Sequence, residues 1–176
     1  MKRMTFSTLV FLAFGLTKPA FADHFYIFSD AALTSTVAFD VAPGMLTVYV
    51  FHYPPPPDAT DATVGSEFHI VPDGFTGVWV SDQALHPGGS GSSQTGWTTV
   101  YDVDVGGPLV AVTYMTFGTS APDSRLKLHS FWGPYPVTYA ATVIGGQPAV
   151  GHDLLINPSP TPVNLSTWGA IKALYH

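Results

Sequence analysis

The chain has 176 residues and no cysteine, and it is 46% hydrophobic but only 10% charged. This length corresponds to one ordinary domain, the apolar content excludes a disordered chain, and the lack of cysteine excludes disulfides, thiolate metal sites and thiol catalysis. The formal net charge of −6 excludes nucleic acid as a partner, because affinity for nucleic acid comes largely from basic residues that neutralise phosphates.

The first 22 residues have the layout of a secretory signal peptide. A basic pair at positions 2–3 precedes an apolar stretch at 6–16, and residues 20–22 form a small-x-small cleavage site. The apolar stretch is too short to span a bilayer, which takes a helix of about 20 residues. We therefore expect cleavage near Ala22 and export to the periplasm, the cell surface or the medium. The mature chain keeps three basic residues against twelve carboxylates, a net charge of −9, and has no predicted transmembrane span.

Nearly all of the mature chain before residue 157 is predicted to form short strands separated by turns. Runs of β-branched and aromatic residues alternate with Gly and Pro, and no helical periodicity is present to supply the crossover helices of a parallel sheet. This pattern predicts an all-β fold, an antiparallel β-sandwich of Ig-like or jelly-roll-like type, over residues 23–156. The predicted strands are 25–28, 36–41, 45–53, 67–71, 75–80, 97–105, 109–117, 125–131, 137–144 and 153–156.

Two of these strands have informative side-chain patterns. The strand at 45–53 is apolar on both faces, which predicts that both faces are covered. The strand at 125–129 alternates polar residues with leucines, which is typical of a half-solvated antiparallel strand. Of the connections, the Gly- and Ser-rich segment 87–93 is expected to be a flexible loop, and the Gly pair at 145–146 is expected to close a hairpin.

The C-terminal residues have a different composition. A Pro-rich linker is predicted at 157–163 and a short helical tail at 164–176. A helix of this length is unstable alone, so its apolar stripe must dock on something. Two alternatives remain open: a sorting factor, anchoring factor or other surface protein recognises the tail, or the tail packs back on the sheet. The stripe, at helical spacing, consists of Trp168, Ile171, Leu174 and Tyr175.

Three segments of the chain resemble a group of uncharacterised exported bacterial proteins. Residues 23–30, DHFYIFSD, are similar to the mature start of that group, DHIGIYSD. Residues 43–52, PGMLTVYVFH, are similar to its PGxxxVYVxH strand, and residues 167–175, TWGAIKALY, are similar to its terminal TWGxIKxLY motif. The resemblance implies secretion and a β-rich fold, and it implies no activity, because none is assigned to the group.

Two sets of side chains have the chemistry of metal ligands without the spacing of a metal motif. Glu67 and His69 share a strand face, and with His52 on a neighbouring strand they would offer zinc ligands. Carboxylates suited to calcium occur in a loop and along one strand. Solvated or isolated polar residues are the favoured interpretation of both sets, so no metal or cofactor is expected. The calcium candidates are Asp58, Asp61, Asp102 and Asp104.

Aromatic rings are the remaining candidates for ligand binding. Trp97 follows a Gly- and Ser-rich loop, and Trp132 and Tyr135 lie in a predicted turn, where exposed rings could stack on a sugar. The favoured alternative is that the tryptophans pack in the core or in turns, because aromatic rings bury large apolar areas. The sequence contains no serine nucleophile elbow and no marked carboxylate pair, and we therefore predict that the protein is not an enzyme.

The leading hypothesis is thus a non-enzymatic, exported β-sandwich that serves as a surface, periplasmic or matrix component of structural or interaction type. A carbohydrate-binding module that uses Trp97, Trp132 and Tyr135 is the alternative. The two hypotheses differ in the expected partner, which is another protein in the first and a glycan in the second.

Overall fold

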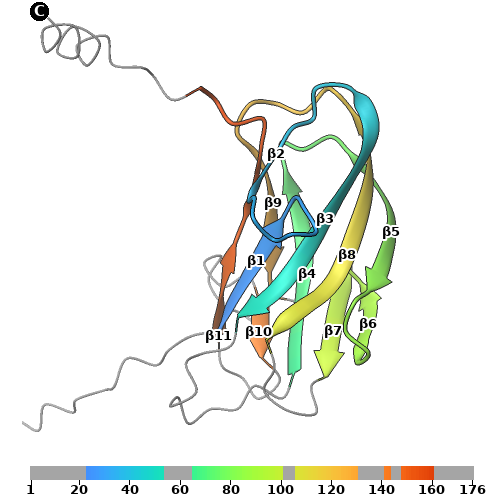
Figure 1. The fold of residues 1–176 in the computed structure, drawn as a ribbon, viewed down its shortest axis with the longest axis vertical. Coiled ribbons are helices and arrows are strands. Elements are labelled where there is room, and N and C mark those ends of the chain that lie inside the picture. Colours follow the sequence, from blue (N-terminus) through green and yellow to red (C-terminus); the bar gives the residue numbers. More distant parts are fainter. Residues whose placement is uncertain (1–22, 54–64, 101–105, 131–140, 144–147, 161–176) are drawn as a thin grey trace, which may run out of the picture.

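A computed structural model describes residues 23–53, 65–100, 106–130, 141–143 and 148–160. The described residues are all strand, turn and loop, which confirms the predicted all-β sandwich (Figure 1). Within these ranges, no helix is long and apolar enough to cross a membrane. The strands are β1 (His24–Phe28), β2 (Val37–Ala38), β3 (Pro43–Tyr53), β4 (Gly65–Asp73), β5 (Val78–Ala84), β6 (Gly89–Ser92), β7 (Gly96–Val100), β8 (Gly107–Phe117), β9 (Ser124–His129), β10 (Ala141–Val143), β11 (Pro148–His152) and β12 (Leu154–Ile156).

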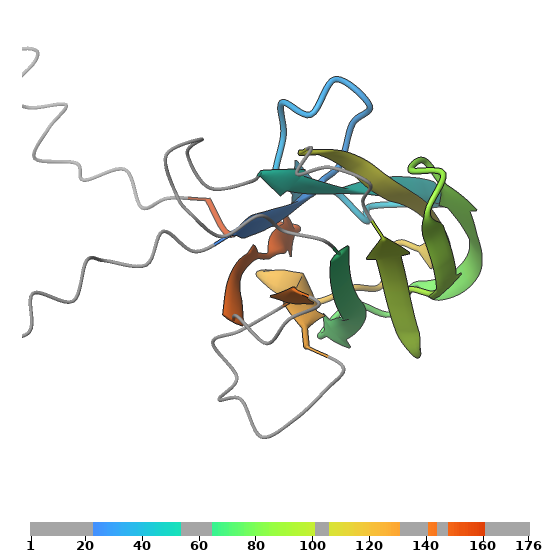
Figure 2. The same ribbon diagram turned by 90° about the horizontal axis from the view of Figure 1, so that it is seen from below.

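The strands lie in two layers that face each other across the core (Figure 2). The front sheet has the order β11-β1-β3-β8-β5. The back sheet has the order β2-β12-β9-β4, with β7 paired to β4 and β6 paired to β7, and β10 joins β4 to β11. Most pairs are antiparallel, as predicted, but β1 pairs with β11 and β2 pairs with β12 in parallel. More than a hundred residues separate the members of each parallel pair, so no local pattern in the sequence announces them.

The core fills the space between the two sheets. On β3, Val48 and Val50 point inward and expose no surface, and Phe68 on β4 and Leu126 on β9 meet them from the back sheet, equally buried. Burying a side chain of this size contributes roughly 1.5–3 kcal/mol. The inward-pointing side chains of the alternating strands are therefore the main source of the free energy that stabilises the fold. The other buried members include Phe25, Ile27, Ile70, Trp97, Leu109, Val110, Val112, Tyr114, Leu128, Leu154 and Ile156.

The predictions made for the side-chain patterns of 45–53 and 125–129 have different outcomes. On β9 the prediction is confirmed, because Leu126 and Leu128 are buried while Arg125 is exposed. On β3 the prediction that both faces are covered is wrong for the described residues. Val48 and Val50 are buried, but Met45 on the opposite face is 62% exposed. The outer face of the front sheet is therefore uncovered at the start of β3, where it carries an apolar side chain.

The prediction of a flexible loop at 87–93 is wrong, because this Gly- and Ser-rich segment contains β6, which pairs with β7. Gly91 has φ of 104°, and a Cβ atom placed there would lie 2.3 Å from the carbonyl oxygen of Gly96. Glycine in this segment therefore permits close approach of two backbones. The Gly pair at 145–146 lies outside the described residues, and the strands on either side of it, β10 and β11, pair antiparallel.

Candidate functional site

A row of exposed apolar side chains crosses three strands on the outer face of the front sheet. Met45 on β3 lies directly opposite Met115 on β8, and Met115 lies opposite Val78 on β5. These side chains are 62%, 42% and 52% exposed, respectively. Three neighbouring strands thus present apolar groups to the same side, where a charged or polar residue would be the ordinary choice for a solvated sheet face.

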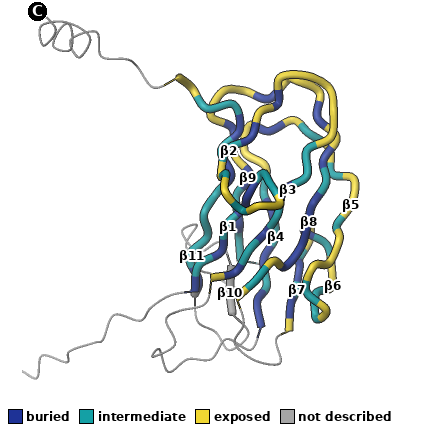
Figure 3. The backbone as a smooth tube through the Cα atoms, in the orientation of Figure 1, coloured by how far each residue is buried: buried dark blue, intermediate teal, exposed yellow. Residues whose placement is uncertain are grey.

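Two more exposed residues extend this row. Phe117 lies two residues after Met115 on the same face of β8. Val41 belongs to the loop before β3, which packs so closely on Gly118 that a Cβ atom there would lie 3.0 Å from the Val41 carbonyl carbon. We call Val41, Met45, Val78, Met115 and Phe117 the methionine patch. Figure 3 shows the exposed positions at the start of β3 and along β5. Exposed apolar residues that are contiguous in this way are typical of interaction sites.

The opposite end of the same face carries rings, which we call the aromatic–histidine cluster: His24 and Tyr26 on β1, Phe51 and Tyr53 on β3, and His152 on β11. Tyr26 stacks on His152 with a centroid separation of 4.0 Å and an angle of 7°. It meets Tyr53 edge-on at 81°, and Phe51 and Tyr53 are tilted by 43°. His24, Tyr26 and His152 are thus stacked roughly parallel to one another, and Tyr53 stands across Tyr26.

The two histidines of this cluster form one hydrogen-bonded pair. Nδ1 of His24 lies 3.0 Å from Nε2 of His152, and the ring centroids are 5.3 Å apart. This centroid separation is close to the largest that two imidazoles can have at that nitrogen distance, so the two nitrogens face each other along the line that joins the rings. One ring therefore donates N–H to the other. Burial, and then the nearby His24, lower the pKa of His152.

A second histidine pair lies on the outer face of the back sheet. His69 on β4 is directly opposite His129 on β9, with ring centroids 5.7 Å apart. Burial, and then the nearby His129, lower the pKa of His69. Both sheets thus hold one histidine whose neutral form is favoured by folding.

These lowered pKa values predict a loss of stability in mild acid. An unfolded histidine has a pKa of about 6.5, so the unfolded chain binds more protons than the folded chain as the pH falls below that value. The free energy of unfolding should therefore decrease between about pH 7 and pH 5, before carboxylates with pKa near 4 begin to titrate. Urea unfolding across this range is the measurement. The double variant His69→Gln, His152→Gln should flatten the dependence, and an equally steep curve for that variant would contradict the assignment.

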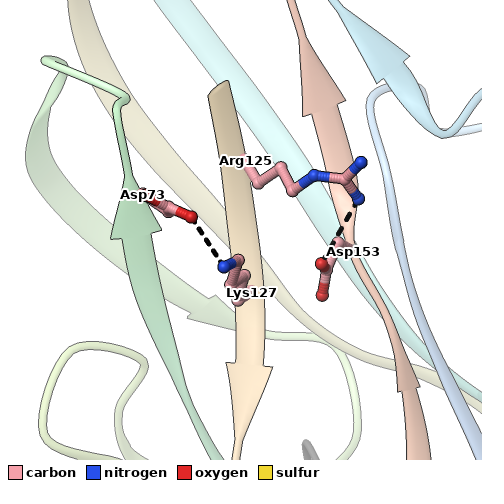
Figure 4. Close-up of polar contacts among 4 residues, drawn as sticks. All are labelled: Asp73, Arg125, Lys127 and Asp153. Carbon is pink, nitrogen blue, oxygen red and sulfur yellow. Dashed lines mark ion pairs between the residues drawn. The ribbon is translucent and has the colours of Figure 1, made fainter. Parts of the chain in front are cut away.

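The outer face of the back sheet differs in chemistry from that of the front sheet. Lys127 Nζ lies 2.6 Å from Asp73 Oδ2, and Arg125 Nη1 lies 3.5 Å from Asp153 Oδ2 (Figure 4). The Lys127 contact is the main reason that the pKa of Asp73 is lowered. Charged pairs of this kind are well solvated and contribute little to stability. Of the two outer faces, the front one is suited to apolar contact.

Of the residues predicted to bind a sugar, Trp97 is described, and the structure corrects its assignment. Its side chain is 3% exposed and its Nε1–H donates to Thr99 Oγ1 at 3.0 Å inside the core, as the packing alternative had it. Trp132 and Tyr135 lie outside the described residues, as do the signal peptide at 1–22 and the tail residues Trp168, Ile171, Leu174 and Tyr175.

The metal candidates do not converge in the described part of the chain. His52 points into the core, where its ring stacks on Phe25 at 4.6 Å and its Nε2 lies 3.5 Å from Asp23 Oδ1. Glu67 and His69 are half-buried and lie on the outer face of β4, away from the core that His52 enters. No group of three or more potential ligands occurs among the residues described. The calcium candidates Asp58, Asp61, Asp102 and Asp104 lie outside them.

Neither a protein-family model nor a curated protein matches the chain. Among solved structures, the third cohesin of ScaC from Acetivibrio cellulolyticus, in complex with the ScaB dockerin, is 11% identical and has a TM-score of 0.50, over 78% of this chain and 99% of that chain. The seventh ScaB type I cohesin from Pseudobacteroides cellulosolvens is 10% identical with a TM-score of 0.44, over 81% of this chain and 96% of that chain. The likeness to the first of these is one of fold, and the chain thus has a β-sandwich of the kind that cohesin domains have.

Proposed function

We propose that this chain is an exported, non-enzymatic interaction component that binds another protein through the outer face of its front sheet. The observation that carries the proposal is the row formed by Met45, Met115 and Val78, which is apolar, contiguous across three strands and exposed. In water such a row costs free energy unless another surface covers it.

A protein surface suits this face better than a glycan does. Protein interfaces are enriched in methionine and aromatic residues and depleted of charge at their centre, as this face is. Methionine is also flexible and polarisable, so Met45 and Met115 can adapt to an apolar partner surface. The likeness in fold to a cohesin that was solved with a dockerin lends support, since it is a sandwich of this kind with a protein bound.

Export is part of the same proposal. The basic pair, apolar stretch and small-x-small site of residues 1–22 support cleavage near Ala22 and a location outside the inner membrane, in the periplasm, on the surface or in the medium. The partner is accordingly expected in the same compartment, as another surface protein or a matrix component.

Site-specific photo-crosslinking in the cells that make the protein tests the proposal. A benzophenone side chain is placed at Met115 or Phe117 on the front sheet, and at Val100 or Lys127 on the back sheet as matched controls. We expect the two front positions to capture the same protein and the two back positions not to capture it. Met45→Asp should reduce capture from Phe117 by about tenfold or more, as loss of a central interface contact does. Mass spectrometry of the captured chain also reads whether it begins at Asp23.

Three outcomes would overturn the proposal. Equal capture from both sheets would show that the front face has no special role, and an uncleaved N-terminus would remove export. Binding of the purified protein to insoluble polysaccharide that disappears in Tyr53→Ala would favour a glycan-binding function instead.

A further inference from the structure

The end of the described chain is fastened beside the methionine patch. Asn157 follows β12 in the left-handed conformation, with φ of 51°, which asparagine tolerates. Its side chain accepts from the Asp40 backbone N–H at 2.8 Å and donates to the carbonyl oxygens of Asp40 and Ser120 at 3.2 and 3.0 Å. Ser159 donates its N–H and hydroxyl to Asp123 at 2.8 and 2.6 Å. The first residues of the predicted linker are thus bound to the domain.

The same polar contacts join this exit point to the patch. The Asp40 carboxylate accepts from the Gly118 N–H at 2.6 Å, and Gly118 follows Phe117 directly. Val41 follows Asp40, and its loop packs on Gly118. Asn157 is thus linked through Asp40 to the loop that carries Val41 and to Gly118, which follows Phe117. The contacts of Ser159 with Asp123 then hold the chain at the loop before β9.

The sixteen residues that follow Pro160 carry the apolar stripe of Trp168, Ile171, Leu174 and Tyr175. Extended linker residues 161–163 reach about 10 Å, and a helix over 164–176 adds about 20 Å at about 1.5 Å per residue. Such a helix is long enough to cross three neighbouring strands, which lie about 4.8 Å apart. Since the segment is tethered to the same domain by a short linker, its effective concentration at the patch is in the millimolar range, far above that of any free partner. Both surfaces are apolar, and each lowers its free energy by covering the other.

We infer that residues 164–176 fold back onto the methionine patch of their own domain and act as its internal ligand. The inference rests on the apolar face of the proposed function, but it does not depend on the identity of the partner. A protein that binds this face must displace the tail. Binding is therefore weakened by the tail and should strengthen when the tail is removed.

Methionine methyl NMR on the chain from Asp23 to His176 tests this inference directly. That chain has two methionines, Met45 and Met115, and both belong to the patch, so labelled methionine gives two signals, assigned by Met45→Leu and Met115→Leu. Docking places the Trp168 indole near them, and its ring current should shift at least one signal. Trp168→Ala in the full chain, and deletion of 164–176, should each move the signals to a common position. Ala173→Gln, on the side of the predicted helix opposite the stripe, should leave them unchanged.

Unchanged methyl signals in both Trp168→Ala and the deletion would overturn the inference. A shift that disappears on dilution would overturn it too, because the tail would then bind a different copy. Valine methyl signals from Val48 and Val112 report whether each variant keeps its core. The sample contains no partner, so failure here leaves the crosslinking result standing, and failure of the crosslinking leaves this one standing.

Discussion

Val48→Asp should unfold the protein or lower its free energy of unfolding by about 4–5 kcal/mol, which is a large part of the total stability of an ordinary domain. Val48 exposes no surface and lies in the centre of β3, packed in the core between the two sheets. An aspartate there would be a buried charge without a partner, and it would also remove apolar contacts. Chemical unfolding followed by circular dichroism measures the effect.

The matched control is Val100→Asp, the same substitution on β7 at a side chain that is 54% exposed. It should change the free energy of unfolding by less than about 1 kcal/mol, as surface substitutions do. Equal losses in the two variants would mean that the core does not lie between the sheets as described. Reducing agent should leave the unfolding curve of either variant unchanged, because the chain contains no cysteine.

The second large effect is expected at Asp40, a buried carboxylate that holds two loops together. It accepts hydrogen bonds from the backbone N–H groups of Gly118 and Ser120 and from the Ser120 hydroxyl. Asp40→Ala would leave these donors without their acceptor in a buried place. Hydrogen bonds to a charged group contribute about 1.5–3 kcal/mol, and an unsatisfied buried donor costs about 1–3 kcal/mol. We therefore expect a loss of about 3–5 kcal/mol in urea unfolding.

The control for Asp40 is Asp123→Asn, which neutralises an exposed carboxylate that also accepts two hydrogen bonds, both from Ser159, and keeps a residue type that tolerates the φ of 58° there. A loss of about 1 kcal/mol or less is expected there.

The decrease in the free energy of unfolding at acid pH offers a second measurement of the Asp40 contribution. Burial acts to raise the pKa of Asp40, and the hydrogen bonds from Ser120 and Gly118 outweigh it, so the pKa is lowered. This carboxylate stabilises the fold above about pH 4, and that contribution is lost as the pH falls further. In Asp40→Ala, the free energy of unfolding should therefore decrease less steeply as the pH falls below about 4.

The fold class could be predicted from local patterns, because each strand shows its own alternation. The run at 45–53 became β3 and the alternating leucines became β9, close to their predicted bounds. Pairing could not be predicted in the same way. The parallel contact of β1 with β11, and the hydrogen bonds between Asp40 and Asn157, join residues that are more than a hundred positions apart.

The candidate site was missed for a different physical reason. The signal was present, since both faces of 45–53 are apolar. The residue type alone, however, does not distinguish an exposed apolar side chain from a buried one. Only the structure, which pairs Met45 with Met115 and Met115 with Val78 and leaves all three exposed, reveals that the second apolar face is uncovered. Trp97 shows the converse, because its place after a Gly- and Ser-rich segment suggested exposure, whereas β6 and β7 pair and the ring lies in the core.

The parallel pairing of the N-terminal strand with β11 has a consequence for how the molecule acquires its structure. Among the described strands, β1 and β2 are the first to be synthesised, and β11 and β12, which complete their ladders, are the last. A chain made at about 5–20 residues per second therefore spends several seconds with both early strands open on one side. Contacts between such distant positions also close slowly. The described sandwich thus cannot be completed until β11 and β12 have been made.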